Sequence, residues 1–185
     1  DGTFSPNRLI TRNEFVKMIV TAFSVEMSDN EIGFKDIEKG SWSEKYIMSA
    51  VAAGIITGMD DTHFGNGMNV TRQDVAVIAE RVMKYKGIEM KSSSLNFADS
   101  NEIADYALMA VAKMNYCGIM NGTGNNKFAP NDGTTRAMAA VVIHNLINYY
   151  ENQTKTDDAG NENAIKNIGS KYDVLYQLEI FKDEY

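Results

Sequence analysis

The 185-residue sequence has little of several residue types on which protein function is often built. It has one cysteine, Cys117, so no disulfide can form within the chain. Its two histidines, His63 and His144, do not share a metal-ligand spacing such as H-x-x-x-H. No stretch approaches the roughly 18 consecutive apolar residues that a membrane span requires. We therefore expect no metal site, no cofactor and no membrane insertion.

Positive charge is also scarce. Lys and Arg total 18 against 25 Asp and Glu, which gives a net charge of -7 and a pI of about 4.9. Because nucleic-acid-binding domains usually carry a basic face, nucleic acid is not an expected partner. An acidic protein that binds an acidic ligand must confine its positive potential to local pockets.

Motifs of catalysis are missing as well. The glycine-rich stretch "GTGNNKF" lacks the lysine spacing of a phosphate-binding loop, and no Ser-His-Asp or Cys-His set is apparent. We therefore predict no catalytic residues and no enzyme, and we look for function in what the sequence repeats.

A Thr-Arg pair returns three times, each time ahead of an apolar run. In every copy a phenylalanine precedes the arginine by eight residues, and turn-forming residues lie between them. The phenylalanines are Phe4, Phe64 and Phe128, and the arginines are Arg12, Arg72 and Arg136.

A second half-motif precedes the second and third copies. It consists of Phe-x-Asp, an aromatic residue twelve positions before a glycine, and a second glycine four positions later. The members are Phe34, Asp36, Trp42, Gly54 and Gly58 in one copy, and Phe97, Asp99, Tyr106, Gly118 and Gly122 in the other. The apolar spacing predicts a helix over residues 42 to 53, closed by Gly54, then a polar loop and a second helix from Thr71.

This pattern predicts a mainly all-α fold of three helix-loop-helix repeats that pack together, since one such unit cannot bury its apolar faces alone. The predicted divisions are listed here: residues 1–33 as the second half of repeat 1, 34–96 as repeat 2, 97–150 as repeat 3, 151–170 as a polar linker, and 171–185 as a short C-terminal helix of unknown role.

The ordered motifs resemble the S-layer homology repeat over about residues 1–150. The resemblance implies pseudo-threefold symmetry around a central helical bundle. It also implies a non-catalytic module at the bacterial cell surface, which binds a secondary cell-wall polysaccharide with an anionic, pyruvylated sugar and so anchors a surface protein to the wall. The third copy departs from the family pattern, with Tyr106 for the usual Trp and Met138 for the usual Glu.

The Thr-Arg pairs have two interpretations. Thr11 and Thr71 are followed three residues later by Glu14 and Asp74, which is the spacing of a helix capping box. Capping does not explain the arginine, because a cation in the first turn opposes the helix dipole. The arginine either pairs with a carboxylate of a neighbouring repeat, such as Asp36 or Asp99, or helps a helix N-terminus to hold an anion.

We expect each arginine to meet the aromatic of the following repeat, Arg12 with Trp42 and Arg72 with Tyr106, and the site of Arg136 to be the weakest. The aromatic rings would stack on sugar, and loop residues would bring backbone N–H groups to the ligand. The predicted ligand-binding residues are Arg12, Trp42, Gly58, Arg72, Tyr106, Gly122, Thr123 and Arg136.

Two other functions fit the same pattern. The repeats could form an assembly module that binds other surface-layer proteins, or the non-catalytic part of a polysaccharide hydrolase. Exposed aromatic and arginine residues converging in one cleft would favour sugar binding, whereas an apolar patch of several hundred Å² would favour protein contacts.

Overall fold

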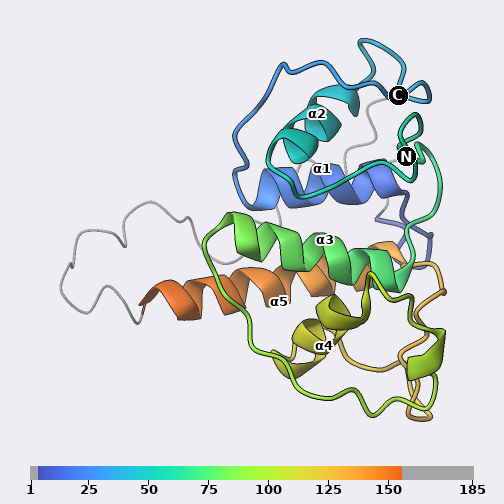
Figure 1. Ribbon diagram of the computed structural model, residues 1–185, viewed down its shortest axis with the longest axis vertical. Helices are drawn as coiled ribbons and strands as arrows, with labels where there is room; N and C mark the ends of the chain where they lie inside the picture. Colours follow the sequence, from blue (N-terminus) through green and yellow to red (C-terminus); the bar gives the residue numbers. More distant parts are fainter. Residues whose placement is uncertain (1–3, 156–185) are drawn as a thin grey trace.

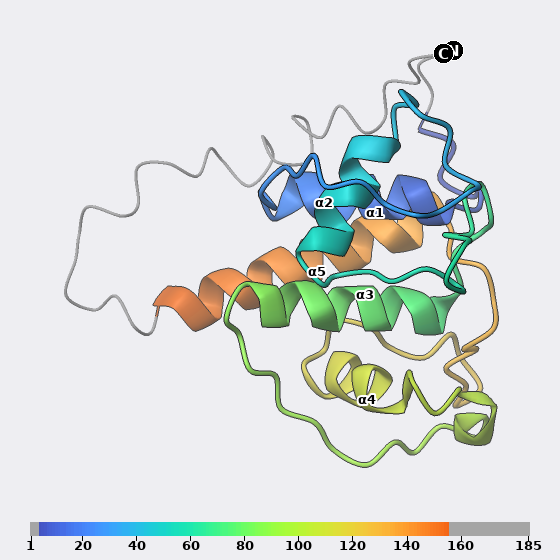
Figure 2. The ribbon, with the colours of Figure 1, turned by 45° about the horizontal axis from the view of Figure 1, so that its top comes forward.

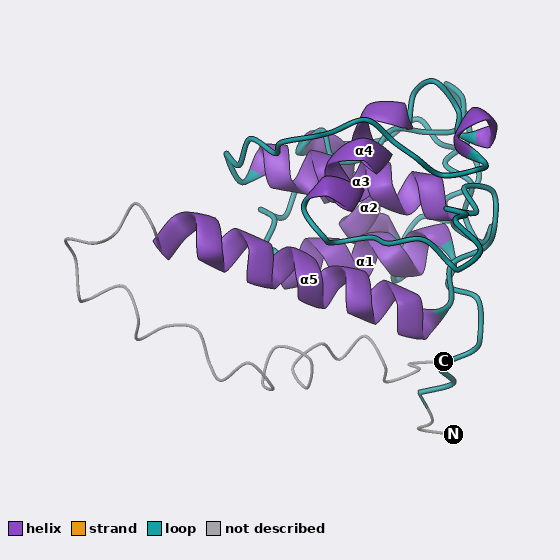
Figure 3. Cartoon of the chain, turned by 90° about the horizontal axis from the view of Figure 1, so that it is seen from below, coloured by secondary structure: helices purple, strands orange, loops and turns teal. Residues whose placement is uncertain are grey.

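Helices joined by long loops make up residues 4–155, the part of the chain that the computed structural model describes (Figure 1). The helices are α1 (Arg12–Ala22), α2 (Glu44–Ala52), α3 (Arg72–Tyr85), α4 (Leu108–Tyr116) and α5 (Arg136–Lys155), with a short 3-10 helix, η1, at Ser100–Glu102. Across these residues the structure has isolated β-bridges but no strand (Figure 3). The predicted mainly all-α class is confirmed.

The three helices that follow the Thr-Arg pairs, α1, α3 and α5, lie next to one another in the middle of the molecule (Figures 1 and 2). Helix α2 packs against α1, and α4 packs against α3 on the opposite side. Apolar side chains from all five helices meet in one hydrophobic core. We call α2 and α4 the front helices and α1, α3 and α5 the back helices. Each front helix therefore packs on one back helix, and the back helices contact one another.

Backbone hydrogen bonds join the three stretches that lead into the back helices. The amide of Ile10 donates to the carbonyl of Thr134 at 2.9 Å, Thr134 donates to Val70 at 3.0 Å, and Val70 donates back to Ile10 at 3.1 Å. This closed ring brings the three helix starts together. The pseudo-threefold symmetry of whole repeats stays a prediction.

Local sequence explains where the helices begin and end. Thr11 and Thr71 are the N-caps of α1 and α3, as predicted, and each hydroxyl accepts a backbone N–H of the first turn. Gly54 follows α2 with a φ of 68°, in the left-handed region that glycine adopts without a steric penalty, so the predicted helix end is confirmed.

Helix α5 extends further than its composition suggests. Residues 151–155, predicted as the start of a polar linker, are helical and carry an ion pair between Glu151 and Lys155 at 3.6 Å, four residues apart. The predicted C-terminal helix at 171–185 lies outside the described residues, and the predicted repeat boundaries remain predictions. Between residues 4 and 155, no helix is both long and apolar enough to cross a membrane.

Candidate functional site

The helix starts hold the three arginines in similar positions. At α1 the capping box is complete: Thr11 accepts from the amide of Glu14, and the carboxylate of Glu14 accepts from the amide of Thr11 at 2.8 Å. At α3 the shorter Asp74 instead accepts the hydroxyl of Thr71 at 2.7 Å. At α5 the hydroxyl of Thr135 accepts from the amide of Met138 at 3.2 Å, and an apolar side chain cannot reciprocate.

Each arginine is anchored to the loop that starts with a repeated phenylalanine. The Nε of Arg12 donates to the carbonyl of Phe64 at 3.0 Å, Arg72 donates to Phe128 at 2.8 Å, and Arg136 donates to Phe4 at 2.8 Å. The three guanidinium groups lie 5.1, 4.8 and 5.6 Å from the centroids of the same phenylalanine rings. The motif therefore places a cation between a carbonyl and a ring face.

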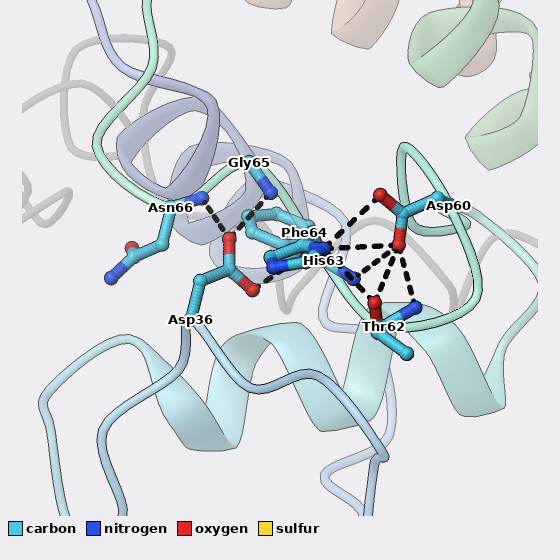
Figure 4. Close-up of polar contacts among 7 residues, drawn as sticks. All are labelled: Asp36, Asp60, Thr62, His63, Phe64, Gly65 and Asn66. Carbon is cyan, nitrogen blue, oxygen red and sulfur yellow. Dashed lines mark hydrogen bonds and ion pairs between the residues drawn. The ribbon is translucent and has the colours of Figure 1, made fainter.

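The carboxylates proposed as arginine partners bind backbone amides instead. Asp36 accepts N–H groups of Phe64, Gly65 and Asn66 (Figure 4). Asp99 accepts N–H groups of Phe128 and Ala129. Burial raises the pKa of both carboxyl groups, but these hydrogen bonds outweigh it and leave each pKa below its ordinary value.

The three arginines differ in how exposed they are to solvent. Arg72 and Arg136 are 6% and 3% exposed, whereas Arg12 is partly exposed. Burial lowers the pKa of Arg72, while the charges of Asp132 and Asp99 oppose that shift. Arg12 and Arg72 each make a second hydrogen bond, through Nη2. Arg12 donates to the carbonyl of Thr57 at 2.9 Å, and Arg72 donates to the carbonyl of Asn121 at 2.8 Å. In Arg72 and Arg136 the cation is therefore enclosed, and Arg12 alone of the three combines this anchoring with access to solvent.

Arg12 lines a cavity of about 490 Å³ to which all three predicted repeats contribute. Gly58 comes from the loop after α2, Asp74 and Arg81 from α3, and Tyr106 from the segment before α4. Three of the predicted residues, Arg12, Gly58 and Tyr106, are thus brought together. The predicted pairing of Arg72 with Tyr106 is wrong, because Tyr106 shares this cavity with Arg12 and Arg72 is not among the lining residues.

The cavity is also lined by residues that were not predicted from the sequence, among them two charged residues and two methionines. Asp74 and Arg81 lie seven residues apart on α3, and Met59 and Met68 are 61% and 52% exposed at the cavity wall. The seven-residue spacing of Asp74 and Arg81 places them on one face of the helix, so the sequence could have predicted that they lie together. The two methionines carry no such pattern, because they lie in an irregular loop.

The cavity carries a positive balance in an acidic protein. Its charged lining residues are Arg12, Arg81 and Asp74. The acceptors that anchor Arg12 are neutral carbonyls, which orient the guanidinium without cancelling its charge, and they use two of its five N–H donors. Burial lowers the pKa of Arg12, and Asp74 opposes that shift. The remaining donors can meet an anion bidentately.

Tyr106 presents a ring beside these charges. It is 62% exposed, and its hydroxyl donates to Asp74 at 2.8 Å. Burial and the bond to Asp74 raise the pKa of Tyr106 to about 12, so the phenol stays neutral at physiological pH. The hydrogen bond fixes the ring, which leaves an aromatic face available for stacking.

The other predicted residues lie elsewhere. Trp42 is 49% exposed, and its ring lies 5.5 Å from Nζ of Lys17 rather than in the cavity of Arg12. Gly122 and Thr123 are exposed in the loop after α4, where the amide of Thr123 donates to the carbonyl of Lys127 at 2.8 Å. No cluster of three or more His, Cys, Asp or Glu suited to a metal occurs in the part of the chain that the structure describes.

Gly58 and Gly122 have a structural explanation. A Cβ on Gly58 would collide with the ring of Phe34 and the carbonyl of Asp60, and one on Gly122 would lie 3.0 Å from the ring of Phe97. The missing side chains make room for the phenylalanines of the Phe-x-Asp turns. Their predicted role in bringing amides to a ligand is not needed to explain them.

Comparison with known proteins identifies the repeats. Residues 33–76 and 96–140 match the S-layer homology domain. The chain belongs to the S-layer homology family. S-layer homology domains are non-catalytic modules that anchor surface proteins to the cell wall.

Several curated relatives contain a similar segment within a much longer protein. An amylopullulanase of Thermoanaerobacterium thermosulfurigenes is 34% identical over 80% of this chain but only 8% of its own length. A cellulosome-anchoring protein of Acetivibrio thermocellus is 35% identical over 45% of this chain and 20% of its own. A surface-layer 125 kDa protein of Lysinibacillus sphaericus is 30% identical over 54% of this chain and 9% of its own. The shared part is therefore a module found in proteins with different names.

Proposed function

We propose that this S-layer homology module binds a secondary cell-wall polysaccharide and thereby holds a surface protein, outside the cell, on a bacterial wall. The observation that carries the proposal is the cavity in which Arg12, Arg81 and Tyr106 converge. A relative named as a cellulosome-anchoring protein and relatives named as surface-layer proteins support the anchoring role.

The cavity chemistry suits an anionic sugar that carries a pyruvate ketal. Such a group presents a carboxylate and a methyl on one carbon of a sugar-bound ring. The carboxylate would meet the guanidinium groups of Arg12 and Arg81, and the methyl would contact Met59 and Met68. The face of the sugar would rest on Tyr106, whose hydroxyl is fixed by Asp74. The charged, apolar and ring parts of the ligand would thus each meet side chains of suitable chemistry.

Pull-down with purified cell-wall sacculi tests the proposal, before and after the polysaccharide is stripped. Charge-assisted hydrogen bonds contribute roughly 1.5 to 3 kcal/mol, so Arg12→Ala should weaken binding about tenfold or more. Arg12→Lys should recover part of the loss, since an ammonium lacks the planar fork. The exposed Lys39 does not line the cavity, and Lys39→Ala is the matched control.

A second variant separates binding from folding. Arg12 also anchors the Phe64 loop, so its loss could act through stability. Tyr106→Ala removes an exposed ring, with little effect expected on the core, and should weaken binding by a similar factor while the melting temperature changes little. Wild-type affinity in both Arg12→Ala and Tyr106→Ala would refute this site, and equal binding to stripped sacculi would refute the polysaccharide.

A further inference from the structure

Methionine is common in this chain, which has 11 of them. Two of the methionines are almost equally exposed, Met59 at 61% and Met109 at 59%. They differ in their surroundings, because Met59 lines the cavity of Arg12, whereas Met109 lies on α4 and is not among the lining residues. Exposed methionines are the ones that a dissolved oxidant reaches, so the cavity has an oxidisable atom in its wall.

A tight turn holds the backbone of Met59 in place. The carboxylate of Asp60 accepts the amides of Thr62 and His63 at 2.7 and 2.8 Å (Figure 4). The carbonyl of His63 accepts the amide of Met59 at 2.8 Å, which closes the turn. The position of Met59 beside the cavity is therefore fixed by hydrogen bonds, although its side chain is exposed.

The thioether of Met59 lies over Gly65, beside the side chain of Arg12. A Cβ on Gly65 would lie 2.6 Å from Sδ of Met59 and 3.5 Å from Cδ of Arg12. The glycine thus leaves the space in which the sulfur rests, and its φ of 88° lies in the left-handed region that glycine adopts freely. The sulfur atom and the arginine side chain are therefore neighbours.

Arg12 has N–H groups left beside this sulfur. Its Nε and Nη2 donate to the carbonyls of Phe64 and Thr57, which uses two of the five N–H donors of a guanidinium. A thioether is only a weak acceptor and competes little for the others. As long as Met59 is reduced, these donors are available to an anion.

We propose that Met59 is a site of reversible oxidation that controls the binding of anions by Arg12. The oxidant is a peroxide, and hydrogen peroxide is the simplest. A lone pair of Sδ attacks one peroxide oxygen, so an S–O bond forms while the O–O bond breaks. The sulfur loses two electrons and becomes a sulfoxide, and the other oxygen leaves as water with both peroxide protons.

The sulfoxide changes the wall of the cavity in two ways. Its oxygen is a polar acceptor beside Arg12 and takes one of the N–H groups that an anion would use. The apolar thioether surface is lost as well. The effect on ligand binding rests on the proposed function, since it requires that the cavity binds an anionic sugar. The contact between oxidised Met59 and Arg12 does not depend on any ligand.

NMR of the Nε–H of Arg12, without ligand, tests this contact. Brief treatment with hydrogen peroxide should oxidise Met59 and Met109 to a similar extent, measured by peptide mass spectrometry, and should shift the Arg12 resonance. Treated Met109→Leu, the matched control, should show the same shift, whereas treated Met59→Leu should show none. The proposal is overturned if Met59 stays reduced while Met109 is oxidised, if the resonance of oxidised wild type does not move, or if it moves equally in treated Met59→Leu.

Pull-down with cell-wall sacculi tests the consequence, each variant being compared with its own untreated form. Oxidation should weaken binding about three- to tenfold in the wild type and in Met109→Leu, because one charge-assisted bond to the ligand is lost. Methionine sulfoxide reductase should restore the binding. Treatment should not change the binding of Met59→Leu, and an equal loss there would refute control by Met59. Failure of untreated wild type to bind would refute the proposed function, while the Arg12 resonance would still decide the contact.

Discussion

At the scale of single residues, the three arginines show how far a motif determines a role. All three donate Nε to the carbonyl of a repeated phenylalanine, but that phenylalanine belongs to another copy, 52, 56 or 132 residues away, so the constant spacing within a copy did not predict the contact. Access to ligand could not be inferred. Arg12 faces a cavity whose other walls come from different repeats, whereas Arg72 and Arg136 are buried. A local pattern does not encode which elements pack around it.

Gly58→Ala is expected to destabilise the fold by roughly 1 to 3 kcal/mol, the usual cost of overpacking. The added Cβ would lie 2.8 Å from the carbonyl oxygen of His63 and against the ring of Phe34. Gly33→Ala is the matched control, since a Cβ there has no atom within 4 Å. Urea unfolding of both variants measures the difference. Equal midpoints would mean that the loop shifts to accommodate the added Cβ, and that close packing is not the reason why residue 58 is glycine.

At the scale of elements, helix starts were predictable and helix partners were not. Thr11 and Thr71 cap their helices through bonds within four residues, which sequence spacing reports directly. The end of α5 at Lys155 was missed because residues 151–155 are polar and have no apolar periodicity. The match of Tyr106 with Arg12 was missed because it depends on how α3 and α4 pack beside α1, which no single repeat contains.

Met138→Glu should stabilise the start of α5 by roughly 0.5 to 1 kcal/mol. A glutamate three residues after Thr135 would complete the capping box found at Thr11 and Glu14, and its charge would favour the helix N-terminus. Val141 is also exposed on α5 but lies beyond the first turn, so Val141→Glu should give no such gain. Thermal unfolding of both variants checks this. A melting temperature that falls in Met138→Glu would show that Met138 contributes packing that outweighs the cap.

At the scale of the whole molecule, the candidate site exists because the back helices meet. The sequence predicted arginine, glycine and tyrosine as site residues, and the structure places Arg12, Gly58 and Tyr106 in one cavity. The same prediction placed Trp42 with Arg12, although Trp42 contacts Lys17. Repeats constrain which residue types are available. The order in which repeats contact each other is set by the hydrogen-bonded ring of Ile10, Val70 and Thr134 and by burial of the core, so it requires the folded chain.

Acid should loosen the contacts between the Phe-x-Asp turns and their loops. The pKa values of Asp36 and Asp99 are lowered in the folded state, because bonds from backbone amides outweigh the effect of burial. Their contribution to stability is therefore complete above the ordinary carboxyl pKa of about 3.9 and is lost as pH falls through the lower folded value. The free-energy gap between wild type and Asp36→Asn should be constant from pH 7 to 5 and shrink below about pH 4. A gap that persists at pH 2, measured by urea unfolding, would contradict this account.

Moderate salt should raise the rate at which an anionic wall polymer associates with the protein. The protein carries a net charge of -7, so at ~0.01 M salt, where the Debye length is about 30 Å, long-range repulsion slows the approach of the polymer. At ~0.15 M that length falls to about 8 Å and the repulsion is largely screened, whereas the short-range bonds of the partly buried Arg12 are screened less. Association rates on immobilised polymer should rise between these two concentrations, and dissociation rates should change less.

In Arg12→Ala the same rise in association rate should remain while dissociation becomes faster, because the repulsion comes from the net charge of the whole molecule and the bound polymer is held by the cavity. An association rate that falls steadily from the lowest salt would show instead that the local positive potential of the cavity, rather than net charge, governs the encounter.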